Sequence, residues 1–409
     1  MSLTKEQLLE AVQAFKDAKF NETKAAESLG LKRACYQARL KAAHLAGMTN
    51  DVQKEKELIT NIPPEVALKD KIRTLEAQIA AFNRDVLSEN YVKTKILKMA
   101  EKKPVPPAWL TKPGSSKSAP GVPTLFASDW HWGENVDPNQ VNNVNSYNMK
   151  IAHKRAKKMI EVAIDLLNNH MVNPKYPGIV LALGGDMVSG DIHEELMATN
   201  DAEIMPVVID LFGVLIWCIS TLADHFGKVF VPCVGGNHGR NTHKIRNKGR
   251  NFTSFDWLTY QFLAKHFETD SRVSFHIPDG PDALYAIYNH KYLLTHGDQF
   301  RGGDGVIGAL GPIIRGDHKK RSRNAQIDME YDTMIIGHFH QLIQLERLIV
   351  NGSLKGYCEY AYSNNFGFEP PRQALWITHP YHGITFSMPV NVDVSFENSD
   401  KSEWVSWKG

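Results

Sequence analysis

The chain has 409 residues and a mass of 46.0 kDa, which is too long for one small domain and predicts two or three units. Hydrophobic residues make up 43% and charged residues 22%, which excludes a disordered chain, a collagen and a small disulfide-stapled protein. The cysteines lie far apart without a CxxC pair, so we expect free thiols and no thiolate metal site at Cys35, Cys218, Cys233 and Cys358.

Neither a secretory leader nor a membrane span is expected. The sequence does not open with a charged stretch followed by an apolar one. Its longest apolar run, 205–222, approaches the ~20 residues of a membrane span, but it contains Pro206 and Asp210 and is better explained by a buried helix. We therefore predict a cytoplasmic protein without a membrane partner.

The formal net charge of +2 is unevenly distributed along the chain. Residues 1–120 carry 21 basic and 14 acidic side chains, a net charge of +7, whereas the remaining 26 basic and 31 acidic side chains give −5. The two parts are therefore expected to meet different environments, and the basic front part is compatible with nucleic acid.

The first segment, residues 1–48, has the pattern of three short helices. Thr4 and Gln7 have the spacing of a capping box that begins the first helix. The predicted apolar face of that helix consists of Leu8, Leu9, Val12 and Phe15. A second helix is predicted over 23–29, before Gly30, and a third over 32–43.

Within this segment, NETKAAESLGLKRACYQARL resembles the helix-turn-helix of Fis-type DNA-binding proteins: paired alanines, a Gly-Leu turn and a basic helix. The resemblance implies that the third helix enters the major groove of DNA. Its implied DNA-binding residues are Lys32, Arg33 and Arg39, which share the helix with Tyr36 and Gln37. A three-helix bundle that serves only as a protein adaptor is the alternative.

Residues 49–103 are predicted to be a helical, coiled-coil-like segment. Alternating spacings of four and three residues join Leu68, Ile72, Leu75, Ile79, Phe82 and Val86. Glu89 and Lys93 interrupt this seam. The helix can form a homodimer through residues 66–86 or pack back on its own chain, and both possibilities stay open. Residues 104–123, rich in Pro, Gly and Ser, are predicted to be a linker.

Residues 124–409 alternate short apolar runs with helical patterns, which predicts an α/β layered domain. Helices are expected over 146–169 and 202–224. Strands are expected over 124–128, 178–183, 228–234, 291–295 and 333–336. Past residue 345 the pattern changes to short strands and turns, so we expect a second sheet that closes the domain. The whole chain is thus an α/β layered β-sheet domain with flanking helices, preceded by a small all-α helix-turn-helix and a coiled-coil-like helix.

A polar cluster follows each of these five strands at once, where open α/β sheets place their sites. The clusters are DWHWG (129–133), GDMVSG (185–190), GNH (236–238), HGD (296–298) and GHFH (337–340). Carboxylate, imidazole and amide together suit Mn²⁺, Fe or Zn²⁺. Because alternate residues of an extended strand point the same way, Asp129 with His131, and His338 with His340, are each expected to direct two side chains into one pocket.

In this order the clusters resemble the motifs of the calcineurin-like metallophosphoesterases over about 210 residues. The resemblance implies two divalent metal ions, with Mn²⁺ as first choice and Fe or Zn as alternatives. It implies that Asp129, His131 and His340 hold the first ion, that Asn237, His296 and His338 hold the second, and that Asp186 bridges them. It also implies that His238 is catalytic and contacts the substrate.

One residue departs from the family pattern. Gly239 stands where the family usually has Asp or Glu after the histidine of GNH. The partner of His238 must therefore come from another part of the chain.

Two basic runs suggest a polyanionic substrate. Residues 240–250 contain Arg240, Lys244, Arg246, Lys248 and Arg250 without an acid, and a second run lies at 315–323. Both are expected to rim the site; a solvated surface loop is the alternative for each. The opening SDWHWG resembles the SbcD-type nucleases. We therefore predict a phosphodiesterase that acts as a DNA nuclease through a metal-activated hydroxide. The alternative is a DNA-binding regulator whose phosphoesterase acts on nucleotides or phosphoproteins.

Overall fold

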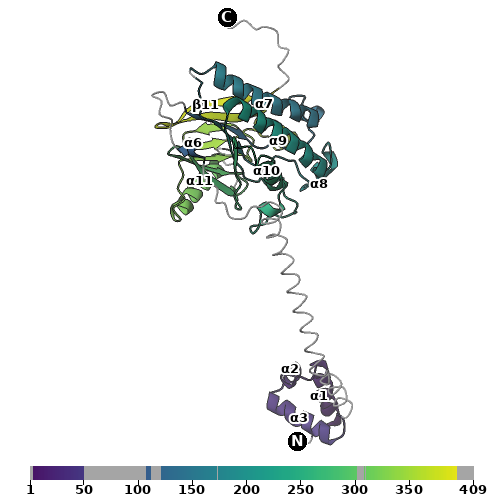
Figure 1. Ribbon diagram of the computed structural model, residues 1–409. Coiled ribbons are helices and arrows are strands. Elements are labelled where there is room, and N and C mark those ends of the chain that lie inside the picture. Colours follow the sequence, from purple (N-terminus) through teal and green to yellow (C-terminus); the bar gives the residue numbers. More distant parts are fainter. Residues whose placement is uncertain are drawn as a thin grey trace. The chain divides into compact units, whose positions relative to one another are not determined.

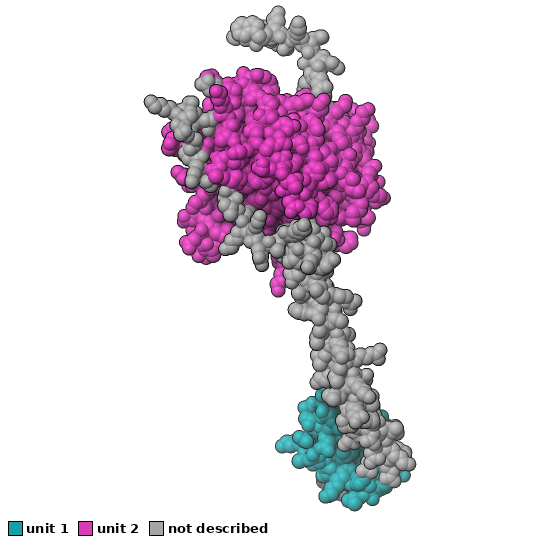
Figure 2. All heavy atoms as spheres, viewed as in Figure 1, with its two compact units in different colours: residues 1–92 teal, residues 93–409 magenta. Residues whose placement is uncertain are grey.

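The computed structural model describes residues 3–49, 107–111, 121–172, 174–301, 308 and 310–393. The chain divides into two compact units, residues 1–92 and 93–409 (Figure 1, Figure 2). The coiled-coil seam predicted over residues 66–86 lies outside the described residues.

The described part of the first unit, residues 3–49, contains three helices: α1 (Lys5–Asp17), α2 (Glu22–Ser28) and α3 (Arg33–Leu45). The predicted capping box is confirmed, because Thr4 Oγ1 accepts from the Gln7 amide and Gln7 Oε1 accepts from the Thr4 amide. The predicted apolar face is wrong at Leu9, which is 49% exposed. The buried stripe of α1 runs through Leu8, Ala11, Val12 and Phe15, with helical spacings of three, one and three residues, and Leu9 falls beside it.

Helix α3 follows a turn at Gly30, whose φ of 64° is a left-handed conformation that suits glycine. Lys32 and Arg33 are exposed, and Arg39 is half-buried. Tyr36 is fully buried, and its hydroxyl donates a 2.8 Å hydrogen bond to the carbonyl of Ala11 in α1. Tyr36 therefore fastens α3 to α1 and does not belong to a DNA-contacting face.

The second unit is of the predicted α/β class, and its described residues form two sheets. The first has the strand order β11 (Gly383–Asn391), β10 (Arg372–His379), β1 (Val122–Ala127), β2 (Ile179–Leu183), β3 (Val229–Pro232) and β4 (Val273–His276). The second has the order β5 (Asp282–Ile287), β6 (His290–Thr295), β7 (Thr333–Ile336), β9 (Leu348–Val350) and β8 (Ile343–Leu345). Strands β1 to β4 are parallel, as are β6, β7 and β9.

The predicted second sheet is present and includes β9, but the last two strands do not belong to it. Strand β10 pairs antiparallel with β1, and β11 pairs with β10, so both extend the first sheet. The second sheet instead begins at β5 and includes two of the five motif strands, β6 and β7. A strand pattern shows which segments are extended, but their partners are chosen by packing between parts of the chain far apart in sequence.

The two sheets pack face to face between layers of helix (Figure 1). Phe230 of β3 and Tyr285 of β5 meet across the interface with ring centroids 5.7 Å apart. Helices α7 (Met149–Asn169), α9 (Ile204–Phe226) and α10 (Phe255–His266) contribute to the core cluster on the other face of the first sheet. Helix α11 (Leu310–Ala325) packs through Ile313 on the second sheet. The described residues also form the short helices α8 (Glu194–Thr199) and α12 (Glu359–Ser363) and 3₁₀ turns at Pro138–Val141 and Asn251–Thr253.

Among the described residues, α9 alone is long and apolar enough to cross a membrane, judged by length and composition. Its inward face, which includes Val208, Leu211, Leu215 and Leu222, is buried in the core cluster under the first sheet. The segment is therefore a core helix, as its sequence predicts.

Two parts of the predicted linker 104–123 belong to the second unit. Residues 108–111 form the short helix α6 (Ala108–Thr111), in which Leu110 is fully buried and its carbonyl accepts from the Tyr288 amide. Val122 and Pro123 already pair with β10 as part of β1. The prolines and glycines around them suggest a linker, but the apolar Trp109 and Leu110 pack against the core between the sheets.

Candidate metal centre

The five motifs meet because the carboxyl ends of their strands lie together. Asp129 follows β1, Asp186 follows β2 and Asn237 follows β3 in the first sheet, while His296 follows β6 and His338 follows β7 in the second. The loops approach so closely that a Cβ atom added to Gly236 would collide with Asp186 Oδ1. Glycine at this position is thus required by space.

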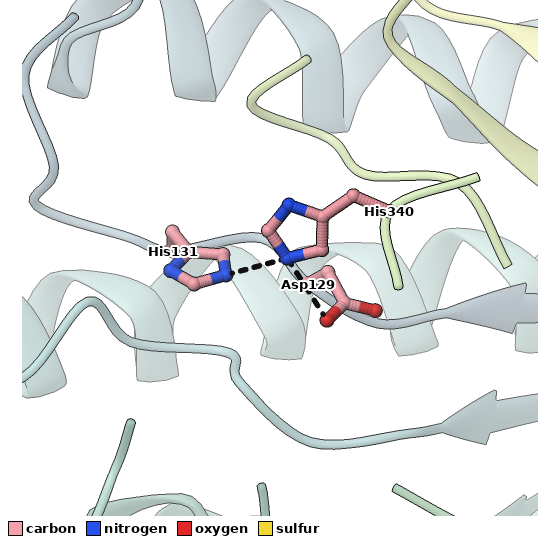
Figure 3. A group of neighbouring side chains, drawn as sticks. All are labelled: Asp129, His131 and His340. Carbon is pink, nitrogen blue, oxygen red and sulfur yellow. Dashed lines mark hydrogen bonds and ion pairs between the residues drawn. The ribbon is translucent and has the colours of Figure 1, made fainter. Parts of the chain in front are cut away.

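The first donor group contains Asp129, His131 and His340 (Figure 3). Their ligand atoms lie within 4.8 Å of one another. Nε2 of His131 is 3.1 Å from Nε2 of His340, which in turn is 3.3 Å from Asp129 Oδ1. Asp129 and His131 are buried, whereas the His340 side chain is 28% exposed and forms the solvent side of the group.

The second donor group contains Asp186, His296 and His338, again with ligand atoms within 4.8 Å. His296 Nε2 lies 2.9 Å from Asp186 Oδ2 and 3.1 Å from Asn237 Oδ1. Asp186 also belongs to a third group with His131 and His238, so it joins the two sets. The structure thus brings together all seven residues that the sequence predicts as metal ligands.

The donor chemistry of the first group fits a divalent cation. His131 Nδ1 lies 3.1 Å from Glu134 Oε2; the two atoms are not aligned for a hydrogen bond, but the charge of the carboxylate favours the tautomer with its hydrogen on Nδ1. Burial, together with the charge of Lys355, lowers the pKa of His131 to about 3 and keeps the ring neutral. The lone pair on Nε2 therefore faces the Nε2 of His340 and the Asp129 carboxylate, a set of donors that a cation between them would satisfy.

The second group likewise has several lone pairs that face one another and that a cation would satisfy. His296 Nδ1 lies 2.8 Å from the Gly184 carbonyl, so Nε2 faces the oxygens of Asp186 and Asn237. Although burial disfavours the charged ring, the carboxylates of Asp186 and Asp129 raise the pKa of His296 to about 10. Positive charge is thus strongly favoured here, and a divalent cation would supply it in place of the proton.

Five of the seven predicted ligands have a left-handed backbone: φ is 56° at Asp129, 47° at His131, 49° at Asp186, 69° at His338 and 53° at His340. Residues other than glycine rarely adopt this conformation, and it costs about 1–3 kcal/mol at each site. The predicted extended geometry is therefore wrong at Asp129–His131 and His338–His340. His338 and His340 instead serve different donor groups, because a tight turn separates their directions.

His238 lies beside both donor groups. Its ring packs edge-on against His131 with centroids 4.6 Å apart, and its amide donates to Asp186 Oδ1 at 2.6 Å. His238 Nδ1 lies 3.0 Å from the Ser189 carbonyl, which is the partner that Gly239 cannot provide. Burial lowers the pKa of the His238 ring.

Several residues of the site are not predicted from the sequence. Glu134 and Lys355 form a buried ion pair of 2.7 Å behind His131. Burial raises the pKa of Glu134, but Lys355 and His131 outweigh it and hold the pKa well below the usual range. Glu134 could have been noticed as an acid directly after DWHWG, whereas Lys355 has no such signal. His193, at the start of α8, has its ring 5.7 Å from that of His238.

The basic loop 240–250 adjoins the site. A cavity of about 10 Å³ beside Asn237 is lined by Arg240, Arg246 and Arg250. The Arg240 guanidinium donates to three backbone carbonyls, and Arg250 donates to Asp298 at 2.8 Å. These two arginines hold the loop together, and the exposed cations of the loop are Lys244, Arg246 and Lys248.

Three cations of the second basic run, 315–323, do not form the expected basic rim, whereas Arg315 and Lys319 are exposed. Lys320 and Arg323 of α11 pair with Asp282 of β5, and Arg321 pairs with Asp317. Lys320 and Arg323 fasten α11 to the second sheet, because Asp282 is largely buried and requires a positive partner.

Neither a scan of protein-family models nor a search of curated proteins gives a match to this chain. Similar chains among the solved structures include the following two. One is a conserved uncharacterized protein, described as a predicted phosphoesterase, from Streptococcus pneumoniae TIGR4, with 12% identity and a TM-score of 0.26 over 66% of this chain and 96% of that one. The other is a single mutant of Vps29 from Entamoeba histolytica, with 14% identity and a TM-score of 0.25 over 66% and 98%. Because these sequence identities and TM-scores are low, the function is inferred from the residues of the site.

Proposed function

We propose that this chain is a metal-dependent phosphodiesterase that hydrolyses DNA. The observation that supports it is the pair of adjoining donor groups, Asp129–His131–His340 and Asp186–His296–His338, with Asn237 beside the second. Their order along the chain is that of the calcineurin-like metallophosphoesterases. The left-handed backbone at five of these residues is stored strain of the kind that gathers at functional sites.

The two groups would hold two divalent ions, with Mn²⁺ as first choice and Fe or Zn as alternatives. Such ions supply Lewis-acid chemistry at a phosphoryl oxygen and at water. Asp186 would serve both ions, since it shares donor groups with His131 on one side and with His296 on the other. Glu134 and the Gly184 carbonyl orient His131 and His296 so that Nε2 of each faces the donors.

His238 is the group placed to transfer a proton. The Ser189 carbonyl accepts from Nδ1 and leaves Nε2 for the substrate. Approach of a phosphate anion counteracts the effect of burial and favours the protonated ring, which can then donate to the leaving oxygen.

DNA is proposed as the substrate because of two exposed basic surfaces. Lys244, Arg246 and Lys248 lie on the loop that follows Asn237 and His238, and Lys32 and Arg33 lie at the start of α3 in the first unit. Phosphates along a strand favour such repeated cations. A DNA-binding regulator whose phosphoesterase acts on nucleotides or phosphoproteins is the second candidate, and a homodimer through residues 66–86 fits either.

The test is hydrolysis by the full chain in Mn²⁺. Labelled single- and double-stranded DNA, a small chromogenic phosphodiester, a nucleotide and a phosphopeptide are compared, with Asp186→Asn as the inactive control. We expect cleavage of DNA and of the small diester. Cleavage of the phosphopeptide or nucleotide alone supports the second candidate, and no hydrolysis of any substrate with Mn²⁺, Fe or Zn contradicts both.

A further inference from the structure

Asp256, the second residue of α10, contacts two loops of the metal centre, the loop after β2 and the loop after β3. It is fully buried, and its carboxylate accepts three backbone amides: Asp186 at 3.0 Å, Met187 at 3.2 Å and Gly236 at 2.9 Å. Asp186 and Met187 belong to the loop after β2, and Gly236 belongs to the loop after β3. One carboxylate thus joins the loop of Asp186 to the loop of Asn237 and His238.

The same carboxylate occupies the space in front of Gly239. A Cβ atom added to Gly239 would lie 2.9 Å from both Cγ and Oδ1 of Asp256 and 3.1 Å from Oδ2. The φ of Gly239 lies outside the left-handed range, so another residue could adopt its backbone conformation. Glycine at 239 is therefore explained by Asp256, because the carboxylate of Asp256 fills the space that a side chain at 239 would need. The absence of an acid after GNH and the presence of a buried acid on α10 thus go together.

Further hydrogen bonds lock this junction. The Phe255 amide donates to the Gly239 carbonyl at 2.6 Å, and the Asn241 amide donates to the Thr253 carbonyl at 2.8 Å. The His238 amide donates to the Asp186 carboxylate. A shift of Asp256 would consequently move the Asp186 carboxylate relative to Asn237 and His238.

Given the proposed metal centre, we propose that Asp256 is the carboxylate that positions its donors. The calcineurin-like pattern has an acid directly after the histidine of GNH. Here that position is Gly239, and α10 supplies the acid that lies beside it. Asp256 contacts backbone amides of both loops and acts through Asp186 and Asn237. Its contribution is the spacing of the donors of the second group, because both oxygens are used to hold the loops together.

The inference predicts that a carboxylate at residue 239 can replace the carboxylate of Asp256. Asp256→Ala should weaken Mn²⁺ binding about 10–100-fold, the effect usual for residues that orient ligands. Gly239→Asp alone should also weaken binding, because its Cβ would collide with Asp256. The double variant Gly239→Asp/Asp256→Ala removes this collision, restores a carboxylate beside the amides, and should recover at least tenfold in affinity over Asp256→Ala.

Isothermal titration with Mn²⁺ and thermal melting with and without Mn²⁺ measure these effects on the full chain. Asp270→Ala, which removes a half-buried carboxylate that pairs with Arg272, is the matched control and should leave the titration unchanged. If Asp256→Ala does not fold, Asp256→Asn replaces it, since it keeps the size and one acceptor.

The outcomes separate this inference from the proposed function. Equal Mn²⁺ affinity in Asp256→Ala and the unsubstituted chain overturns the role of Asp256 and leaves the metal centre intact. A lower Tm with an unchanged Mn²⁺-induced increase means a purely structural role and overturns it as well. A double variant no better than Asp256→Ala overturns the relocation. Failure of the unsubstituted chain to bind Mn²⁺, Fe or Zn contradicts the proposed function and the inference together.

Discussion

The side chains of the metal centre are buried and fixed, whereas those of the two basic surfaces, the start of α3 and the loop 240–250, are exposed. Asp129, Asp186 and His296 are buried, and each has fixed hydrogen-bond or ion-pair partners. Lys32, Arg33, Lys244, Arg246 and Lys248 are exposed. A small cation is bound by geometry, which requires donors fixed in advance, whereas a polyanion is bound by the sum of charges, which tolerates mobile side chains. Single substitutions should therefore be severe in the centre and gradual on the basic surfaces.

The largest effect is expected from Asp186→Asn. A neutral amide cannot serve two cations as a carboxylate does, so both ions should be lost and hydrolysis should fall to background. Metal content of the purified variant, measured by mass spectrometry, and turnover of a small diester check this. Two tightly bound ions with full turnover would remove Asp186 from the centre.

His238→Ala should separate binding of metal from chemistry within the same buried site. Its Nδ1 is used by the Ser189 carbonyl, and its proposed role is proton transfer, so turnover should fall ~10²-fold while metal content stays nearly unchanged. Steady-state kinetics and metal analysis on one preparation provide the measurement. Loss of an ion would identify His238 as a ligand instead.

Gly236→Ala tests whether the close approach of the two loops sustains the centre. The new methyl group would collide with Asp186 Oδ1, so the loops must separate, and we expect a loss of about 2 kcal/mol in the free energy of unfolding. Chemical denaturation followed by circular dichroism measures it. The matched control is Gly213→Ala in α9, where an added Cβ meets open space, and which should stabilise the chain by about 0.5–1 kcal/mol. Equal effects at both glycines would contradict the packing described here.

The smallest and most salt-dependent effect is expected from Lys244→Ala, Arg246→Ala and Lys248→Ala combined. Turnover of a small diester should be unchanged, while affinity for double-stranded DNA should fall several-fold at moderate salt. The slope of log affinity against log salt should become shallower by about 0.9 for each phosphate that the protein no longer neutralises. A control that removes Lys150, Lys154 and Lys157 from the exposed face of α7 carries the same charge change. If both sets lower affinity equally, the loop has no special role.

The elements and the chemistry of the site were determined by the sequence alone. Periodicity, capping residues and the polar clusters after apolar runs are local features, so α1, α7, α9 and the five motif strands follow from neighbouring residues. The identity of the seven donors also follows, because a metal site requires particular side chains whatever the fold around it.

Only the tertiary structure decided how these parts combine. The pairing of β10 with β1, the division of the motif strands between two sheets, and the left-handed backbone at the donors depend on contacts between distant segments. The same holds for Glu134 with Lys355 and for Asp256, which lies 17 residues beyond Gly239 and yet fills the space beside it. Burial and close packing select such partners in three dimensions, and one-dimensional spacing carries no record of them.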